Sequence, residues 1–417
     1  MQEIKQFCKF LYHLIKHIFL FRKEFIAQKY ALNKEIYKIP NSFLILEPAM
    51  TSKGNLGDEA LILGVIKTIK KNYINSKISI LHYSTNDGML NEDVNLIPFN
   101  PDKLDQTFFD SVSQFERFYV LGADIMDGHY SNYSVIFPIQ LCRILSKLDI
   151  KTNIISFSYN SHPTKYSKFL FKYLPNNIRI SCRDFVSLDR LKKITNHDIE
   201  CYPDIALTMP PSLMNNILEN IKKDLFSNPN FVNKKKILIN LNPLPFQKNN
   251  LETKFLTISK NTISTLIKEG FFICLAPHVY RDGDSDLNAQ KIVYSKLSKE
   301  EKSSVYVLDQ KLHANEIKRL ITYFDLVITG RMHMAIATIG MGQACGIVGY
   351  QGKCEGFINL FDLPKSCLIN FEDIILGNNF LDFIHINYNN LIINKERCKL
   401  KLDINISEAE KHVKAIK

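Results

Sequence analysis

Residues 328–337 read Ile328-Thr329-Gly330-Arg331-Met332-His333-Met334-Ala335-Ile336-Ala337, the pattern of a strand that turns sharply into a helix. The apolar run from Phe324 to Thr329 predicts the strand, Gly330 permits the turn, and the small apolar residues that follow are compatible with a helix. Free N–H groups at the start of a helix attract anions, and a guanidinium and an imidazole add charge and a titratable proton there. We therefore expect an anion-binding element formed by Gly330, Arg331, Met332 and His333.

The same alternation of strand and helix extends through most of the chain. In the first half, strands are predicted at 42–46, 78–82, 117–121, 152–156 and 178–182, and helices at 61–71, 133–148 and 166–174. In the second half, strands are predicted at 236–241, 271–276, 305–307, 324–329 and 345–350, and helices at 251–269, 286–297 and 314–322. This alternation is typical of doubly wound parallel sheets, so the predicted fold class is α/β with two Rossmann-like domains facing a cleft.

The best boundary between the two halves is the stretch 208–212, because its consecutive prolines, Pro210 and Pro211, can continue neither a helix nor a central strand. The expected divisions are an N-terminal amphipathic helical segment at 1–40, a first Rossmann-like domain at 41–208, a second at 213–365, and a C-terminal tail at 366–417. Apolar residues recur in the tail, so we expect it to pack on the body of the protein.

Much of the formal net charge of +11 lies in residues 1–40, which hold eight basic side chains and three acidic ones. The same segment carries a broad set of apolar residues, namely Phe7, Phe10, Leu11, Leu14, Ile15, Ile18, Phe19 and Phe21. A basic amphipathic helix of this kind can lie on an anionic membrane surface, and it can equally pack on the protein's own body. A spanning helix is excluded because Lys9 and Lys16 interrupt the run, and no small-residue cleavage site marks a signal peptide.

The nine cysteines form no Cys-x-x-Cys pair, which indicates free thiols in a reducing compartment and argues against a zinc or iron–sulfur site. Lysines are scattered without an aromatic platform among them, so the positive charge does not indicate nucleic acid. We expect no metal and no cofactor, and a phosphorylated substrate or acidic lipid as the partner of the positive charge.

The loop that precedes the first long helix, Lys53-Gly54-Asn55-Leu56-Gly57-Asp58-Glu59, has two glycines that let the backbone approach a ligand closely. It matches neither a Walker loop nor a dinucleotide fingerprint. Asp58 could cap the helix. In the functional interpretation, Gly54 and Gly57 give access while Asn55 and Asp58 bond to sugar hydroxyls or lie beside the reacting oxygen.

Two carboxylates follow the strand at 117–121, in Gly122-Ala123-Asp124-Ile125-Met126-Asp127. Open α/β sheets bind ligands at the carboxyl ends of their strands, so Asp124 or Asp127 could be a general base. A metal site lacks a third visible ligand, and a loop-stabilising turn is the structural alternative.

Other strand ends also carry polar side chains. Arg183 ends the strand at 178–182 and could pair locally with Asp184 or face the cleft as a second guanidinium beside Arg331. The strand ends at 277–282 and 350–356 add further candidates for the same cleft, namely His278, Tyr350 and Lys353.

Five segments together resemble the polysaccharide pyruvyl transferase family: 54–60, 183–184, 202–206, 330–333 and 349–353. The resemblance covers roughly positions 42 to 365 and is most specific at the first and fourth segments. It implies a GT-B-like fold and transfer of pyruvate from phosphoenolpyruvate to sugar hydroxyls as a ketal. It also implies that Arg331 and His333, with Arg183 as the upstream arginine, bind phosphoenolpyruvate. Many members have consecutive glycines where this chain has Gly122-Ala123, so the acceptor side is expected to differ.

In this chemistry the arginines and a helix N-terminus neutralise phosphoenolpyruvate, and protonation of its methylene carbon prepares attack by a sugar hydroxyl. His333 either donates that proton or binds phosphate, and Asp58 or Asp124 accepts the proton of the hydroxyl. The alternatives are a GT-B glycosyltransferase that uses a nucleotide sugar and a non-catalytic glycan-binding or scaffold protein. We expect a cytoplasmic enzyme of cell-surface polysaccharide synthesis, at the inner face of the plasma membrane, with a lipid-linked saccharide as acceptor.

Overall fold

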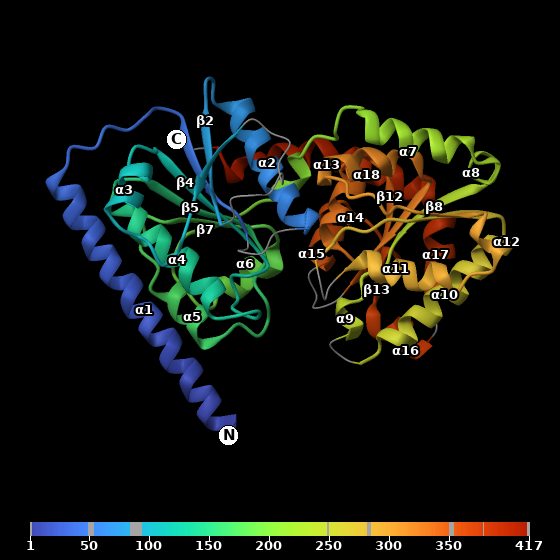
Figure 1. Ribbon diagram of the computed structural model, residues 1–417, viewed down its shortest axis with the longest axis horizontal. Helices are drawn as coiled ribbons and strands as arrows, with labels where there is room; N and C mark the ends of the chain where they lie inside the picture. Colours follow the sequence, from blue (N-terminus) through green and yellow to red (C-terminus); the bar gives the residue numbers. More distant parts are fainter. Residues whose placement is uncertain are drawn as a thin grey trace. The chain divides into compact units, whose positions relative to one another are not determined.

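The computed structural model describes residues 2–48, 54–83, 94–247, 250–281, 285–349, 354–377 and 379–414, with the side chains of the first helix from Ile18 onward. The chain divides into two compact units (Figure 1). Unit 1 comprises Met1–Ser52, Val65–Ile205 and Ala409–Lys417, and unit 2 comprises Lys53–Gly64 and Ala206–Glu408. None of the helices in the described ranges combines the length and apolar character that crossing a bilayer requires.

Among the described residues, unit 1 has a seven-stranded parallel sheet in the order β3-β2-β1-β4-β5-β6-β7. Its strands are β1 (Ser42–Leu46), β2 (Lys77–His82), β3 (Asn95–Pro98), β4 (Arg117–Ala123), β5 (Lys151–Phe157), β6 (Arg179–Cys182) and β7 (Ile199–Cys201). The strand order reverses between β1 and β4, which makes the carboxyl ends of these strands the topological switch point. The five strands predicted for this half are confirmed, whereas β3 has mostly exposed residues and β7 only three, so neither gave a hydrophobic signal.

The helices of unit 1 cover both faces of this sheet. They are α1 (Gln2–Asn33), the C-terminal part of α2 (Leu56–Asn72), α3 (Gln106–Val112), α4 (Tyr133–Ser146), α5 (Lys165–Lys172) and α6 (Phe185–Lys192), with the 3-10 turn η4 (Glu410–His412) near the C-terminus. Helix α2 begins at Leu56, five residues before the predicted start, because Asn55 caps it: the Asn55 Oδ1 accepts a hydrogen bond from the Gly57 N–H at 3.1 Å.

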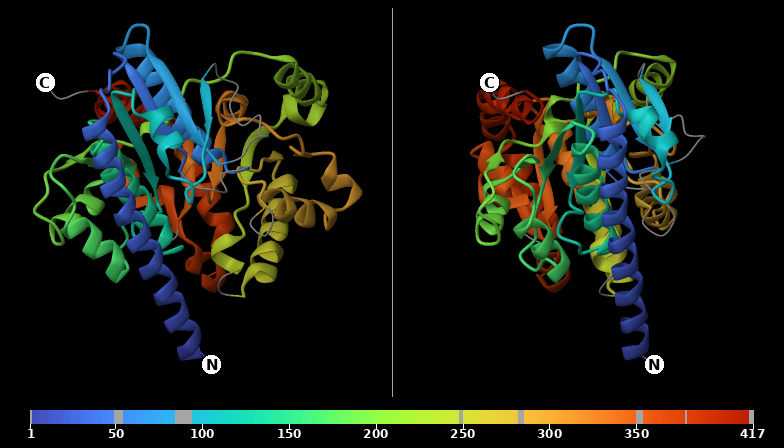
Figure 2. Two further views of the ribbon diagram at one scale, coloured as in Figure 1. Left: turned by 60° about the vertical axis from the view of Figure 1, so that its left-hand side comes forward. Right: turned by 90° about the vertical axis from the view of Figure 1, so that its left-hand side faces the viewer.

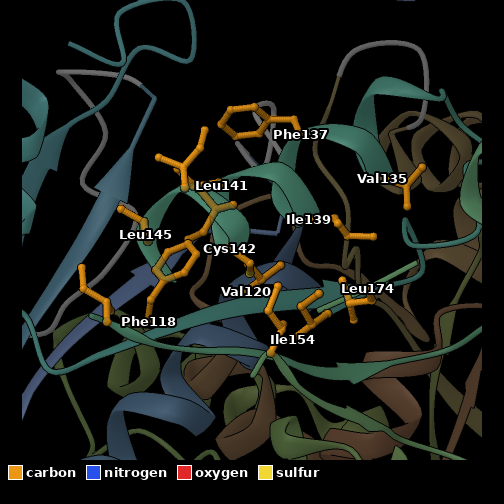
Figure 3. Close-up of a cluster of buried hydrophobic side chains, with 14 of the residues drawn as sticks. Phe118, Val120, Val135, Phe137, Ile139, Leu141, Cys142, Leu145, Ile154 and Leu174 are labelled. Atoms are coloured by element: carbon orange, nitrogen blue, oxygen red, sulfur yellow. The ribbon is translucent and has the colours of Figure 1, made fainter. Parts of the chain in front are cut away.

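Helix α4 is apolar on nearly all sides, and its residues from Val135 to Cys142 are buried without a break. Figure 3 shows its side chains meeting Phe118 and Val120 of β4 and Ile154 of β5. The opposite side of α4 contacts α1, drawn as one long helix in Figure 2. A helix covered on both sides has no solvent face, which explains its uniformly apolar sequence.

Unit 2 repeats the doubly wound pattern with a six-stranded parallel sheet in the order β10-β9-β8-β11-β12-β13, counted over the residues that the structure describes. Its strands are β8 (Lys235–Asn240), β9 (Phe271–Leu275), β10 (Val305–Val307), β11 (Leu326–Thr329), β12 (Ala344–Gly349) and β13 (Leu368–Asn370). Here the order reverses between β8 and β11. The predicted strands of this half are confirmed, and the α/β fold class with them.

The helices of unit 2 flank this sheet and bury a second apolar core around Ile237, Ile239 and Ile328. They are α7 (Asn216–Ser227), α8 (Pro229–Asn233), α9 (Leu244–Gln247), α10 (Glu252–Lys268), α11 (Asp286–Ser295), α12 (Lys299–Lys302), α13 (Ala314–Leu320), α14 (Met332–Ile339), α15 (Cys354–Leu360), α16 (Phe371–Gly377), α17 (Phe380–Asn389) and α18 (Leu391–Ala409). Short 3-10 turns lie at η1 (Ile205–Thr208), η2 (Ile321–Tyr323) and η3 (Lys365–Cys367). The predicted tail is therefore helical.

Two segments join a unit from which they are separated along the chain. Residues 53–64 join unit 2 because their backbone bonds to the loop after β9: the Leu56 N–H donates to the His278 carbonyl at 3.1 Å, and the Tyr280 N–H to the Gly54 carbonyl at 2.7 Å. Residues 409–417 join unit 1, where the Arg179 guanidinium donates to the His412 carbonyl at 2.8 Å.

Candidate active site

The element predicted around Arg331 lies at the switch point of unit 2. Strand β11 ends at Thr329, Arg331 precedes the first helical residue, and α14 begins at Met332. The Asn242 side chain, just beyond β8, donates to the Gly330 carbonyl at 2.8 Å. A Cβ atom on Gly330 would lie 2.7 Å from the Asn242 Cβ, so the close approach of the two strand ends requires glycine at this position.

Arg331 is held by a buried carboxylate that the sequence did not single out. The Asp286 Oδ1 accepts from Arg331 Nε at 3.1 Å and from Nη2 at 2.8 Å, and Asp286 is fully buried. The Asp286 Oδ2 accepts from the Asn240 side chain at 2.8 Å and from the backbone N–H groups of His278 and Val279 at 3.0 and 3.1 Å. These bonds fix the orientation of the guanidinium, because the carboxylate that binds it is itself held on its other side.

His333 lies against the first turn of α2. A Cβ atom on Gly57 would come within 2.4 Å of the His333 Nδ1, so glycine at position 57 makes room for the imidazole. Gly54 has a φ of +75°, a conformation that favours glycine, and its carbonyl accepts the Tyr280 N–H. The two glycines of this loop thus have separate roles: one shapes the turn and the other admits the histidine.

His278 completes this cluster. Burial lowers the pKa of His278 well below its usual value, and the positive charges of His333 and Arg331 lower it further. His278 is therefore neutral at physiological pH and offers a hydrogen bond without adding charge. Three short segments, each at the end of a strand or the start of a helix, bring the residues of this cluster together, namely Asn55, Gly57, His278, Arg331 and His333. Helices α2 and α14 both begin at this cluster. The arrangement is suited to binding a small anion.

A carboxylate–imidazole pair joins the first turn of α2 to the residue that caps α13. The His313 Nδ1 and Glu59 Oε1 are 2.8 Å apart. Burial raises the pKa of Glu59, and the hydrogen bond that His313 donates to Glu59 raises the pKa of His313, so the pair holds one proton more tightly than either group would in water. Asp58, the predicted base, is buried in the same turn of α2. Glu59 belongs to the predicted loop motif, but its partner His313 is 254 positions away in the sequence.

Three of the predicted site residues belong to unit 1. Arg183 is buried, and its Nη1 donates to the Asp204 Oδ2 at 2.8 Å, while Asp184 caps α6 through the Ser187 N–H. Asp127 is buried and accepts the His129 N–H at 2.8 Å, which is the loop-stabilising turn considered as an alternative. Asp124 is partly exposed and accepts from the Tyr130 hydroxyl at 2.9 Å. Substrate roles for these three side chains stay predictions.

Tyr350 and Lys353 lie outside the described residues, so their predicted roles are not tested. Within the described ranges, no group of three or more His, Cys, Asp or Glu side chains could hold a metal ion. The residues that sequence reasoning missed, Asp286, Asn240, Asn242 and His313, share one property: each acts by holding another residue of the site.

Solved structures with a similar fold include a glycosyltransferase and a UDP-GlcNAc 2-epimerase. A glycosyltransferase from Rickettsia africae matches with a TM-score of 0.54 and 12% identity over 92% of this chain and 100% of its own. A UDP-GlcNAc 2-epimerase from Neisseria meningitidis matches with a TM-score of 0.50 and 11% identity over 89% of this chain and 97% of its own. At such identities the likeness shows the GT-B-like fold alone.

The family is shown by a sequence model instead. The model for polysaccharide pyruvyl transferases matches residues 55–352, which is more than half of the chain. The chain therefore belongs to the polysaccharide pyruvyl transferase family, and the predicted resemblance is confirmed. The match includes the start of α2, the loop after β9 and the Arg331 element. No curated protein matches the chain in a sequence search.

Proposed function

We propose that this protein transfers pyruvate from phosphoenolpyruvate onto two hydroxyls of a saccharide, forming a cyclic ketal. One observation carries the proposal: Arg331, oriented by Asp286, lies with His333 and His278 where α2 and α14 begin. A small dense anion is the ligand that such a cluster favours. Membership of the pyruvyl transferase family supports phosphoenolpyruvate over other phosphate esters.

In the proposed reaction Arg331 and the helix N-termini bind the phosphate and carboxylate groups. His333 donates a proton to the methylene carbon, which becomes a methyl group. The first sugar oxygen bonds to the adjacent carbon, and the proton of that hydroxyl passes to Asp58, the predicted base. The oxygen of the second hydroxyl then bonds to that carbon as the bond to the phosphate oxygen breaks, and its proton leaves with the inorganic phosphate. We assign the donation to His333 rather than His278 because His278 is fully buried and its lowered pKa keeps it neutral.

A transfer assay with isotope-labelled phosphoenolpyruvate and a panel of saccharides tests this proposal, with the mass gain of a pyruvyl ketal as readout. Arg331→Lys should lower kcat/KM by about 100-fold, because an ammonium group cannot form the paired hydrogen bonds of a guanidinium. Arg143→Lys is the matched control: Arg143 pairs with Glu24 between α4 and α1. Label transfer from a nucleotide sugar instead, or biological output unaffected by Arg331→Ala and His333→Ala, would contradict the proposal.

We further propose that α1 places the enzyme at an anionic membrane surface, where a lipid-linked acceptor is available. One side of α1 packs on unit 1 through Leu20 and Ala27. The other side exposes three large apolar residues in successive turns, Ile18, Phe21 and Phe25, with exposed Arg22 and Lys29 near them. Apolar side chains flanked by cations match the interface of an anionic bilayer.

Point substitutions test α1 better than a deletion, because removing the helix would also uncover α4. The triple variant Ile18→Ser, Phe21→Ser, Phe25→Ser should lose binding to phosphatidylglycerol vesicles and keep its transfer activity on a water-soluble saccharide. The proposal predicts weaker binding to phosphatidylcholine vesicles by the unaltered protein. Equal vesicle binding by the two proteins would show that this face has another role.

A further inference from the structure

The start of α2 belongs to unit 2, although the chain directly before and after it belongs to unit 1. Residues 53–64, which we call the inserted segment, join unit 2. This segment carries Gly57, which borders the His333 ring, and the predicted base Asp58 in the same turn. The arrangement of the candidate active site within unit 2 therefore depends on how the inserted segment is held.

The first turn of α2 lies between the starts of two other helices of unit 2. Gly57 and Glu59 are two residues apart, so the directions in which their Cβ atoms project differ by about 200° around the helix. On one side, Gly57 borders His333 at the start of α14. On the other side, the Glu59 Oε1 lies 2.8 Å from the Nδ1 of His313, the residue that caps α13. Since α13 and α14 also contact each other, the pair fixes this turn relative to His333.

Glu59 is a buried carboxylate whose charge needs compensation. Burial raises the pKa of Glu59, whereas hydrogen bonds from His313 and from the backbone N–H of Ala314 lower it. Both of these donors lie at the start of α13. A buried charge that loses its partner destabilises the structure around it. A charged His313 therefore holds the inserted segment against α13 more firmly than a neutral one does.

The groups around the pair set the pH at which this attachment weakens. The hydrogen bond to Glu59 raises the pKa of His313, burial lowers it, the carboxylates of Glu59 and Glu316 raise it, and Lys311 lowers it. Glu316 also raises the pKa of Glu59, and burial raises the pKa of Tyr280, which stays neutral beside the pair. A raised pKa in the folded state stabilises that state below the unfolded value, about 6.5 for histidine. This contribution is lost as the pH rises through the folded value, so the attachment weakens toward alkaline pH.

We propose that Glu59 and His313 are positioning residues whose ion pair holds the first turn of α2 in place beside His333. This inference rests on the proposed function, because that turn borders the proton donor and carries Asp58. Neither member of the pair contacts the substrate in the proposed reaction; both act through the position of the turn. Loss of the shared proton at alkaline pH loosens the turn, so the pair also makes the site sensitive to pH.

The test compares His313→Gln with the double variant His313→Gln, Glu59→Gln in the full-length protein. Glutamine at position 313 keeps a hydrogen-bond donor opposite Glu59 but leaves the buried carboxylate without a countercharge. At pH 6.5, His313→Gln should lower kcat/KM for phosphoenolpyruvate at least about tenfold. The double variant should recover most of this loss, because its two neutral amides can bond to each other and leave no buried charge.

The pH profile shows whether the charge of His313 is responsible. The ratio of kcat/KM between the unaltered protein and His313→Gln should fall toward one at about pH 9, because His313 then loses its proton as well. Titration of phosphoenolpyruvate and of His333 affects both proteins and cancels in this ratio. The matched control is His385→Gln, since His385 forms a 2.7 Å pair with Glu269 on the surface of unit 2. Its ratio should stay near one at every pH.

Amide hydrogen exchange separates this inference from the proposed function, because it needs no reaction. At pH 6.5, residues 55–64 should exchange at least about fivefold faster in His313→Gln than in the unaltered protein, while β9 should exchange at an unchanged rate. If no labelled pyruvate is transferred but the exchange differs in this way, the proposed function fails and the attachment of α2 by the pair stands.

Three results would overturn the inference. One is a kcat/KM of His313→Gln within about threefold of the unaltered protein at pH 6.5. Another is unchanged exchange of residues 55–64 in that variant. The third is a double variant as impaired as the single one and with a lower midpoint of thermal unfolding, which would show that the pair only supports the fold.

Discussion

Replacing Asp286 by asparagine removes the negative charge that compensates Arg331, and the structure sets the size of the effect. The carboxylate accepts bonds from Arg331 at 2.8, 3.1 and 3.4 Å and three more from Asn240, His278 and Val279. An asparagine oxygen can replace only one of the two carboxylate oxygens. Its NH₂ group must then face either the guanidinium or the three N–H donors on the other side, and in either case two hydrogen-bond donors face each other.

Breaking a buried ion pair by removing one partner costs about 3–5 kcal/mol, because the remaining charge stays buried without compensation. Asp286 is fully buried and Arg331 nearly so, which places this pair in that range. Since whole domains are stable by only about 5–15 kcal/mol, Asp286→Asn should lose a large part of the stability of unit 2. The double variant Asp286→Asn, Arg331→Met should recover at least about 1 kcal/mol, because it leaves no buried charge.

The chain has no tryptophan, so urea unfolding is followed by circular dichroism and tyrosine fluorescence. Amide hydrogen exchange of the segment 271–281 gives a local readout, because His278 and Val279 donate their N–H groups to Asp286. Asp110→Asn is the control, since Asp110 pairs with Lys34 on the exposed surface and solvent screens that pair. An Asp286→Asn protein as stable as this control, with unchanged exchange at 271–281, would refute the reasoning.

Three further substitutions have expected outcomes. Gly57→Ala should lower the rate of pyruvyl transfer at least about tenfold, because the new Cβ would lie 2.4 Å from the His333 ring. The free energy of unfolding should change little, because that ring can rotate away. In a His333→Ala background, Gly57→Ala should have no further effect on kcat. Ala123→Gly should raise the free energy of unfolding by about 0.5–1 kcal/mol in urea titrations, because relief of the positive φ outweighs the added chain entropy, whereas a loss of stability would show that Ala123 is not strained. Burial lowers the pKa of His412 to about 3, so the folded protein keeps it neutral; stability is full above the unfolded pKa near 6.5 and falls by about 1.4 kcal/mol per pH unit below it. His412→Gln should remove this fall in the free energy of unfolding at low pH. Parallel curves for the variant and the unaltered protein between pH 7 and pH 4.5 would contradict this prediction.

The strands and their order of appearance could be predicted because a buried parallel strand leaves a continuous apolar run. Strand β1 was predicted with its observed bounds, and β10 likewise. Strand β3 was missed because its side chains are largely exposed, so its sequence carries no such run. The predicted start of α2 was five residues too late. Capping by Asn55 is a contact of one side chain with the backbone, so it leaves no periodic pattern of apolar residues in the sequence.

The sequence by itself determined the α/β class, the strand–turn–helix element around Gly330 to His333 and the family, since each depends on residues that are close neighbours along the chain. Only the tertiary structure decided that Asp286 holds Arg331, that Gly57 makes room for His333, and that Glu59 meets His313. These partners are separated by 45 to 276 positions in the sequence. Parallel sheets bring distant strand ends to one edge, so such pairs leave no local pattern in the sequence.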